Sequence, residues 1–175
     1  MSKRMVSVFV AAAAAALAGC AGTSGASAPA DADWATQQFA KLRSLQGDWV
    51  ASGADSSMPG ANLHYEVTSG GSAVVEHIFP GSDHSMVSVY TLDNGRLVMT
   101  HYCALGNQPH MVASPAEGGA IEFRCDGAGN TKSEGDAHMH RGVFRIADGS
   151  LRAEWTLYEK GEAGGTVVMD MVRAN

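Results

Sequence analysis

The sequence has few charged residues, few aromatic residues and few cysteines. Asp, Glu, Lys and Arg make up 17% of the 175 residues, and the 12 Lys and Arg residues are spread along the chain without a run. Nucleic-acid binding needs a clustered basic face, so we expect no nucleic-acid partner. Three cysteines are too few for the disulfide framework that small secreted domains use to supplement a core. The length suits a single domain with its own core.

Long apolar runs are also lacking. The main apolar stretch, Met5–Leu17, is too short to cross the ~30 Å hydrocarbon core of a bilayer as a helix. It follows two basic residues, Lys3 and Arg4, which is the order typical of a secretory signal peptide. The stretch runs into Leu17-Ala18-Gly19-Cys20, where small residues precede a cysteine.

This ending resembles the lipobox of bacterial lipoproteins. The resemblance implies that residues 1–19 are a signal peptide and that the Cys20 thiol carries a diacylglycerol, which anchors the chain to the cell envelope. Ala21 after the cysteine implies the outer membrane, facing the periplasm. An ordinary secretory signal with an incidental cysteine is the alternative. Loss of the leader removes two basic residues and takes the formal charge from −6 to −8, so anionic headgroups would repel the domain.

The chain after the leader divides into a tether and a folded domain. Residues 20–33 are mostly Ala, Gly, Ser and Thr and predict a flexible tether, so the folded domain should span 34–175. Asp33 can cap a short helix from Trp34 to Leu45. Short period-two runs follow, and they predict strands near 47–53, 61–69, 72–79, 85–93, 95–104, 110–114, 120–126, 136–147, 150–159 and 165–173.

These runs predict an all-β domain, an up-and-down antiparallel β-barrel of about ten strands with a short N-terminal helix. Asn94-Gly95 and Asp148-Gly149 are strong two-residue hairpin signals, because a type I′ turn needs positive φ at both positions. No helical segment long enough for a crossover separates the runs. A meander of this length closes most easily into a barrel, which removes its two edge strands.

Two sets of residues carry a resemblance to known barrels. Leu45-Gln46-Gly47-Asp48-Trp49 resembles the start of lipocalins and fatty-acid-binding proteins, in which a short helix runs into Gly-x-Trp. The segments 84–95, 100–109, His138-Met-His140 and 154–156 resemble a family of uncharacterised bacterial lipocalin-like, calycin-type proteins. The resemblance implies the barrel fold and supplies no activity.

Strand alternation places the polar candidates. His101 shares a face with Met99, His138 and His140 share one with Phe144, and Trp155 lies on an apolar face of its own strand. We expect all of these faces to point into the barrel. A buried polar group costs about 1–3 kcal/mol unless it is hydrogen-bonded, so inward histidines indicate a wet cavity or a ligand. The predicted binding site for a small apolar or amphipathic ligand is therefore His101, His138, His140, Met99, Trp155 and Phe144.

Other interpretations stay open. The histidines could simply be hydrogen-bonded inside a hydrated barrel. His138, His140 and His101 could instead hold a divalent metal, although a meander puts His101 about 14 Å away along the sheet. A haem needs one axial histidine, as in the nitrobindin type of barrel, and either cofactor would allow an enzyme. No catalytic motif occurs, so no catalytic residue is assigned. A packed barrel with an envelope-structural role is the last alternative.

Cys103 and Cys125 remain once Cys20 is assigned to the lipid. An even pair in an oxidising compartment predicts a disulfide, which would contribute about 3 kcal/mol for a loop of this length. The strand predicted at 110–114 opposes this pairing, because two strand spacings are nearly 10 Å and a disulfide needs Cα atoms within about 7 Å. Two buried thiols are the alternative.

Overall fold

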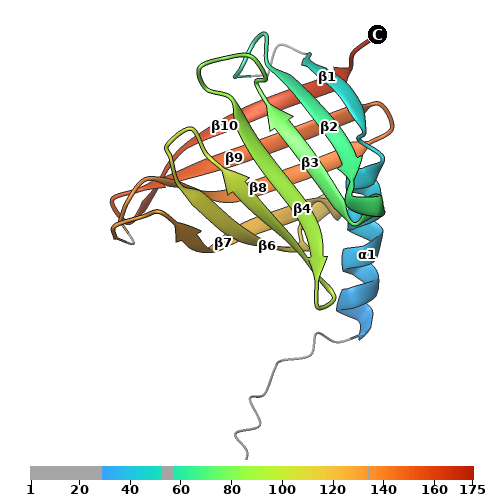
Figure 1. The fold of residues 1–175 in the computed structure, drawn as a ribbon, viewed down its shortest axis with the longest axis horizontal. Coiled ribbons are helices and arrows are strands. Elements are labelled where there is room, and N and C mark those ends of the chain that lie inside the picture. Colours follow the sequence, from blue (N-terminus) through green and yellow to red (C-terminus); the bar gives the residue numbers. More distant parts are fainter. Residues whose placement is uncertain (1–28, 53–56, 134) are drawn as a thin grey trace, which may run out of the picture.

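The computed structural model describes residues 29–52, 57–133 and 135–175. These residues form one α-helix and a closed antiparallel barrel of ten strands (Figure 1). The sequence prediction of a ten-strand up-and-down barrel is thus confirmed. The predicted signal peptide, residues 1–19, and the predicted lipidation site, Cys20, lie outside the described residues.

Each strand pairs with its neighbours in the sequence, and the first strand pairs with the last to close the barrel. Single-turn 3₁₀ helices at Ser69–Gly71 and Glu117–Gly119 connect β2 to β3 and β6 to β7. The elements are α1 (Pro29–Arg43), β1 (Gly47–Ala51), β2 (Asn62–Thr68), β3 (Ala73–Ile78), β4 (Met86–Asp93), β5 (Arg96–Tyr102), β6 (Gln108–Pro115), β7 (Ile121–Gly129), β8 (His138–Ala147), β9 (Ser150–Glu159) and β10 (Glu162–Arg173).

The α-helix begins earlier than the sequence predicts. It starts at Pro29, so residues 29–33 of the predicted tether are helical. Proline is favourable in a first helical turn, and Asp31 lies where a negative charge interacts well with the helix dipole. The helix has neither the length nor the hydropathy to cross a bilayer.

Helix α1 closes one end of the barrel. Its residues Phe39 and Leu42 are buried at helical spacing, and Leu45 follows them into the core. Trp49 at the start of β1 is 1% exposed, and its indole Nε1 donates a hydrogen bond to the Leu45 carbonyl at 2.6 Å. The guanidinium of Arg173 lies 4.7 Å from the centre of the Trp49 ring. This end of the barrel is therefore packed shut.

The barrel interior is packed in its middle by aromatic and methionine side chains, among them Tyr65, Tyr90, Phe123, Phe144 and Met111. The hairpin β4–β5 turns at Asn94 and Gly95, which both have positive φ, as the sequence predicts.

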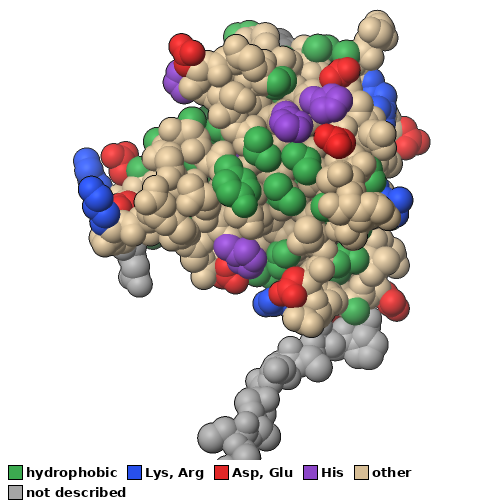
Figure 2. Space-filling model, viewed as in Figure 1, with side chains coloured by type: hydrophobic (Ala, Val, Ile, Leu, Met, Phe, Trp, Pro, Cys, Tyr) green, Lys and Arg blue, Asp and Glu red, His purple; other side chains and the backbone are tan. Residues whose placement is uncertain are grey.

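On the outside, apolar side chains gather in the middle of the face shown in Figure 2, with charged side chains mostly at its margins. The end opposite α1 carries the loops that build the candidate site.

Candidate functional site

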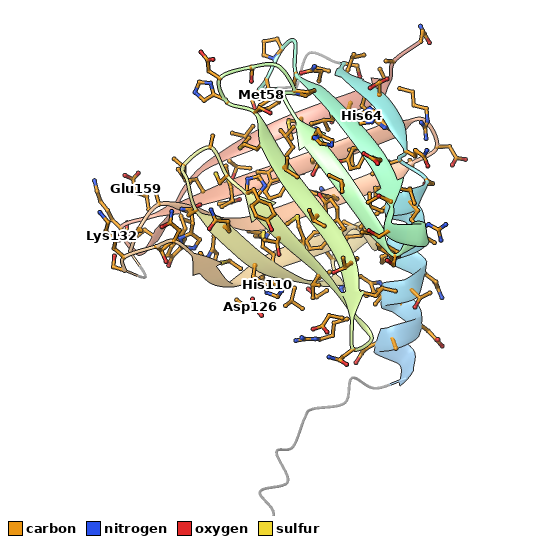
Figure 3. The ribbon with its side chains drawn as sticks, viewed as in Figure 1. Met58, His64, His110, Asp126, Lys132 and Glu159 are labelled. Atoms are coloured by element: carbon orange, nitrogen blue, oxygen red, sulfur yellow. The ribbon has the colours of Figure 1, made fainter. Side chains whose placement is uncertain are left out.

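A cavity of about 520 Å³ opens at the end of the barrel opposite α1. Its wall is mostly apolar and comes from the loop before β2, the β3–β4 and β5–β6 loops, and residues of β8, β9 and β10. Met58, labelled in Figure 3, lies at this end. Cavities of this size hold small organic ligands, and their apolar walls favour ligands with a hydrocarbon part. Apolar lining residues include Met58, Phe79, Met86, Trp155, Leu157 and Met169.

Only two of the six predicted ligand-binding residues line this cavity. His101 and Trp155 form part of its wall. Met99 and Phe144 are completely buried in the packed core and do not reach it. His138 and His140 lie outside the lining, so of the three predicted histidines only His101 lines this cavity.

A β-bulge in β8 explains the position of the other two histidines. Met139 pairs with Leu157 of β9, and both residues line the cavity. The register between β8 and β9 then shifts between Met139 and Arg141, which inserts His140 as an extra residue. The rule that alternate residues of a strand share a face therefore cannot be carried from Phe144 across the bulge to His138. His138 instead pairs with Tyr158, and both histidine rings contact the Tyr158 ring.

His101 belongs to a buried polar network that crosses β2, β3, β4 and β5. The Glu76 carboxyl accepts hydrogen bonds from the hydroxyls of Tyr65 at 2.6 Å and Tyr90 at 2.5 Å. Ser88 also hydrogen-bonds with Glu76, and its Oγ lies 3.0 Å from Nδ1 of His101. All five residues are buried, with an exposed fraction of at most 1%. The network thus links a carboxyl group in the core to an imidazole on the cavity wall.

Burial controls the protonation of this network. Desolvation raises the pKa of Glu76, and the hydrogen bonds from Tyr65, Tyr90 and Ser88 oppose that rise. Burial together with the nearby Glu76 raises the pKa of both tyrosines well above its usual range, so both keep their protons. Burial lowers the pKa of His101 to about 4, which leaves the imidazole neutral near pH 7. His101 can therefore act as a hydrogen-bonding group without carrying charge into the cavity.

Two residues that line the cavity each have a buried nitrogen atom without a hydrogen-bond partner among the described residues. These atoms are Nε2 of His101 and Nε1 of Trp155. The two rings are neighbours, with centroids 5.1 Å apart. Buried polar atoms are nearly always hydrogen-bonded, so this unpartnered pair stands out among the residues that line the cavity.

The cysteines do not form the expected disulfide. Cys103 and Cys125 are both free thiols, because β6 lies between the strand that leads to Cys103 and the strand that contains Cys125. Cys103 lines the cavity, whereas Cys125 has its Sγ 3.2 Å from the Gly127 carbonyl. Burial raises the pKa of both thiols.

The predicted metal set of three histidines does not form either. His101 lies on the cavity wall, and the ligand atoms of His138 and His140 lie beside Cys125, all within 4.8 Å of one another. The hairpin connection of β7 to β8 could have indicated Cys125 as the neighbour of these histidines. Glu76 and Ser88 are not among the predicted site residues, although Glu76 shares its alternation with the apolar Val74 and Ile78.

The comparisons with known proteins give no family. No family model matches the chain, and no curated protein matches it.

Proposed function

We propose that this protein is a lipid-anchored, lipocalin-like protein of the cell envelope that binds a small amphipathic molecule in the open end of its barrel. The observation that carries the proposal is the pair of buried, unpartnered nitrogens, His101 Nε2 and Trp155 Nε1, on the wall of a largely apolar cavity. The cavity volume of about 520 Å³ favours a binding role over that of a packed structural barrel.

The polar network determines which hydrogen-bonding group a ligand would need in order to pair with His101 and Trp155. An ionised carboxylate only accepts hydrogen bonds, so with Glu76 ionised the Ser88 hydroxyl donates to it. The Ser88 oxygen then accepts the proton on Nδ1 of His101, which leaves a lone pair on Nε2. The indole Nε1 of Trp155 is a donor only. A hydroxyl group satisfies both atoms, because it donates to His101 and accepts from Trp155.

The experiment compares an alcohol with its methyl ether, in which a methyl group replaces the hydroxyl hydrogen and removes the donor. 1-Decanol and 1-methoxydecane are titrated against the protein loaded with the fluorophore N-phenyl-1-naphthylamine, and displacement is followed by fluorescence. We expect 1-decanol to bind roughly 3–10-fold more tightly than the ether, the range that one hydrogen bond contributes. His101→Phe should abolish that preference while keeping an aromatic ring in the wall.

The matched control is His64→Ala, which removes a surface imidazole that bonds to Asp48. It should leave both probe affinities unchanged. Equal displacement by both probes in the wild type would contradict the assigned role of His101. A stoichiometric Soret band on addition of haemin, lost in His101→Phe, would instead assign the cavity to haem.

The anchor is supported by the lipobox-like sequence that ends at Cys20. We expect the protein, expressed in a Gram-negative host, to incorporate an alkyne-labelled fatty acid and to sediment with the outer membrane. Cys20→Ser should remove the label and release the protein from the membrane fraction. A labelled Cys20→Ser variant would show that the lipid is attached elsewhere, and an unlabelled wild type would contradict the anchor.

A further inference from the structure

A cluster of three metal-ligating side chains lies beside the cavity and is not part of its wall. Cys125 of β7 and His138 and His140 of β8 each offer one ligand atom, and these atoms all lie within 4.8 Å of one another. Nε2 of His138 is 3.1 Å from Nδ1 of His140. One thiol and two imidazoles form a donor set that suits Zn²⁺ and other borderline or soft first-row ions.

Neighbouring groups hold the ligand atoms in suitable orientations. Nδ1 of His138 lies 2.8 Å from the Asp136 carbonyl, which accepts only, so this nitrogen carries the proton and Nε2 carries the lone pair. A carbonyl that fixes the tautomer in this way is the usual outer partner of a metal-binding histidine. The His140 ring stacks on Tyr158 with centroids 4.5 Å apart, which restricts its rotation.

The charges around the cluster are compatible with a cation. Arg124 acts electrostatically on His140, and it is paired with the carboxylate of Glu122. Arg141 binds the same carboxylate at 2.6 Å. Asp126, next to Cys125 in the sequence, is bonded to His110 at 2.6 Å, and Figure 3 shows these two side chains together. Two guanidinium groups thus share one carboxylate, and with Asp126 the formal charges of these four side chains sum to zero.

We propose that Cys125, His138 and His140 bind one Zn²⁺-like divalent ion. The ion bonds to the Cys125 sulfur, whose proton goes to solvent, and to Nε2 of His138. The proton that lies between the two histidine rings moves from Nδ1 to Nε2 of His140, and Nδ1 becomes the third ligand atom. Water completes a tetrahedral set. One proton is released for each ion bound.

The position of the cluster gives the ion a structural effect. Backbone pairing between β7 and β8 covers residues 121–124 of β7, although this strand continues to Gly129. The cluster lies just beyond the last of these pairs, Arg124 with Arg141. A bound ion would therefore join the two strands at the point where their hydrogen-bonded ladder stops, and it would stabilise the open end of the barrel.

The test uses the full chain, purified without a polyhistidine tag and kept in a phosphine reductant. Zn²⁺ is titrated by calorimetry, and Co²⁺ is titrated by absorption spectroscopy. We expect one Zn²⁺ per chain, a thiolate-to-cobalt charge-transfer band and a Tm that rises with Zn²⁺ concentration. Cys125→Ser should remove the charge-transfer band, and Cys125→Ser and His138→Ala should each weaken Zn²⁺ binding at least roughly 100-fold.

Matched controls replace the other two cysteines and a distant histidine. Cys103→Ser, Cys20→Ser and His64→Ala should keep the band, the stoichiometry and the rise in Tm. Circular dichroism of each variant without metal checks that the barrel has formed. Absence of Zn²⁺ binding below 100 μM in a folded wild type would overturn the proposal. So would a charge-transfer band that persists in Cys125→Ser or disappears in Cys103→Ser.

Discussion

At the scale of single residues, Glu76 is the most unusual side chain in the barrel. A carboxyl group with 0% exposure is rare, because burial disfavours its charged form. Glu76 is tolerated because Tyr65, Tyr90 and Ser88 bring hydroxyl groups to it from the neighbouring strands. The same network fixes the orientation of His101 through Ser88. The buried carboxyl group of Glu76 therefore orients the imidazole of His101, which lines the cavity, through Ser88.

Replacing Glu76 should destabilise the fold strongly. Glu76→Ala leaves the hydroxyls of Tyr65 and Tyr90 buried without their acceptor, and each such group costs about 1–3 kcal/mol. We expect the free energy of unfolding to fall by about 3 kcal/mol or more, measured by urea denaturation with tryptophan fluorescence. Glu66→Ala, which removes an exposed carboxylate from β2, should change stability by less than about 0.5 kcal/mol. Equal losses in the two variants would contradict this role of Glu76.

At the scale of elements, the sequence predicts the strands well because most of them keep a strict period of two. All ten predicted runs are strands, since each has one apolar face and ends at turn residues. The candidate site is less predictable because it depends on irregularities. The bulge at His140 inserts one residue into β8 and breaks the alternation on which the three-histidine prediction relies.

Contacts between elements explain the remaining differences. His101 and Trp155 could be predicted to face inward because their strands keep the period, but their common position on a cavity wall depends on the barrel's closure. The predicted disulfide fails because β6 separates Cys103 from β7. Cys125 approaches the histidines because β7 and β8 are neighbouring strands of the barrel. Alternation within one strand carries no information about either contact.

At the scale of the whole molecule, the barrel has two unlike ends. One end is closed by α1 and Trp49, with the apolar residues of the helix in the core. The other end contains both the cavity and the cluster of Cys125, His138 and His140. Figure 3 shows Lys132 and Glu159 close together, and a hydrogen bond from Lys160 N to Gly135 O joins the β9–β10 turn to the β7–β8 connection. The end that α1 closes is thus packed, and the candidate binding groups lie at the other end.

This arrangement makes the stability of the whole barrel depend on pH through His101. Its pKa is about 4 in the folded state against an ordinary value of 6.5, so the unfolded chain binds more protons between these pH values. The stability that comes from keeping His101 neutral is complete above pH 6.5 and is lost as the pH falls toward 4. A shift of this size corresponds to about 3 kcal/mol. The raised pKa of Glu76 acts in the opposite direction, because its contribution is complete below its ordinary value and is lost as the pH rises.

Comparison of the wild type with His101→Phe separates the two effects, since Glu76 is present in both proteins. Urea unfolding at pH 7 and pH 4 should show that the wild type loses about 3 kcal/mol more than the variant over this range. If the wild type and His101→Phe lose the same stability between pH 7 and pH 4, then His101 is not buried as a neutral imidazole. The assignment of a lone pair to Nε2 of His101 would then have no support.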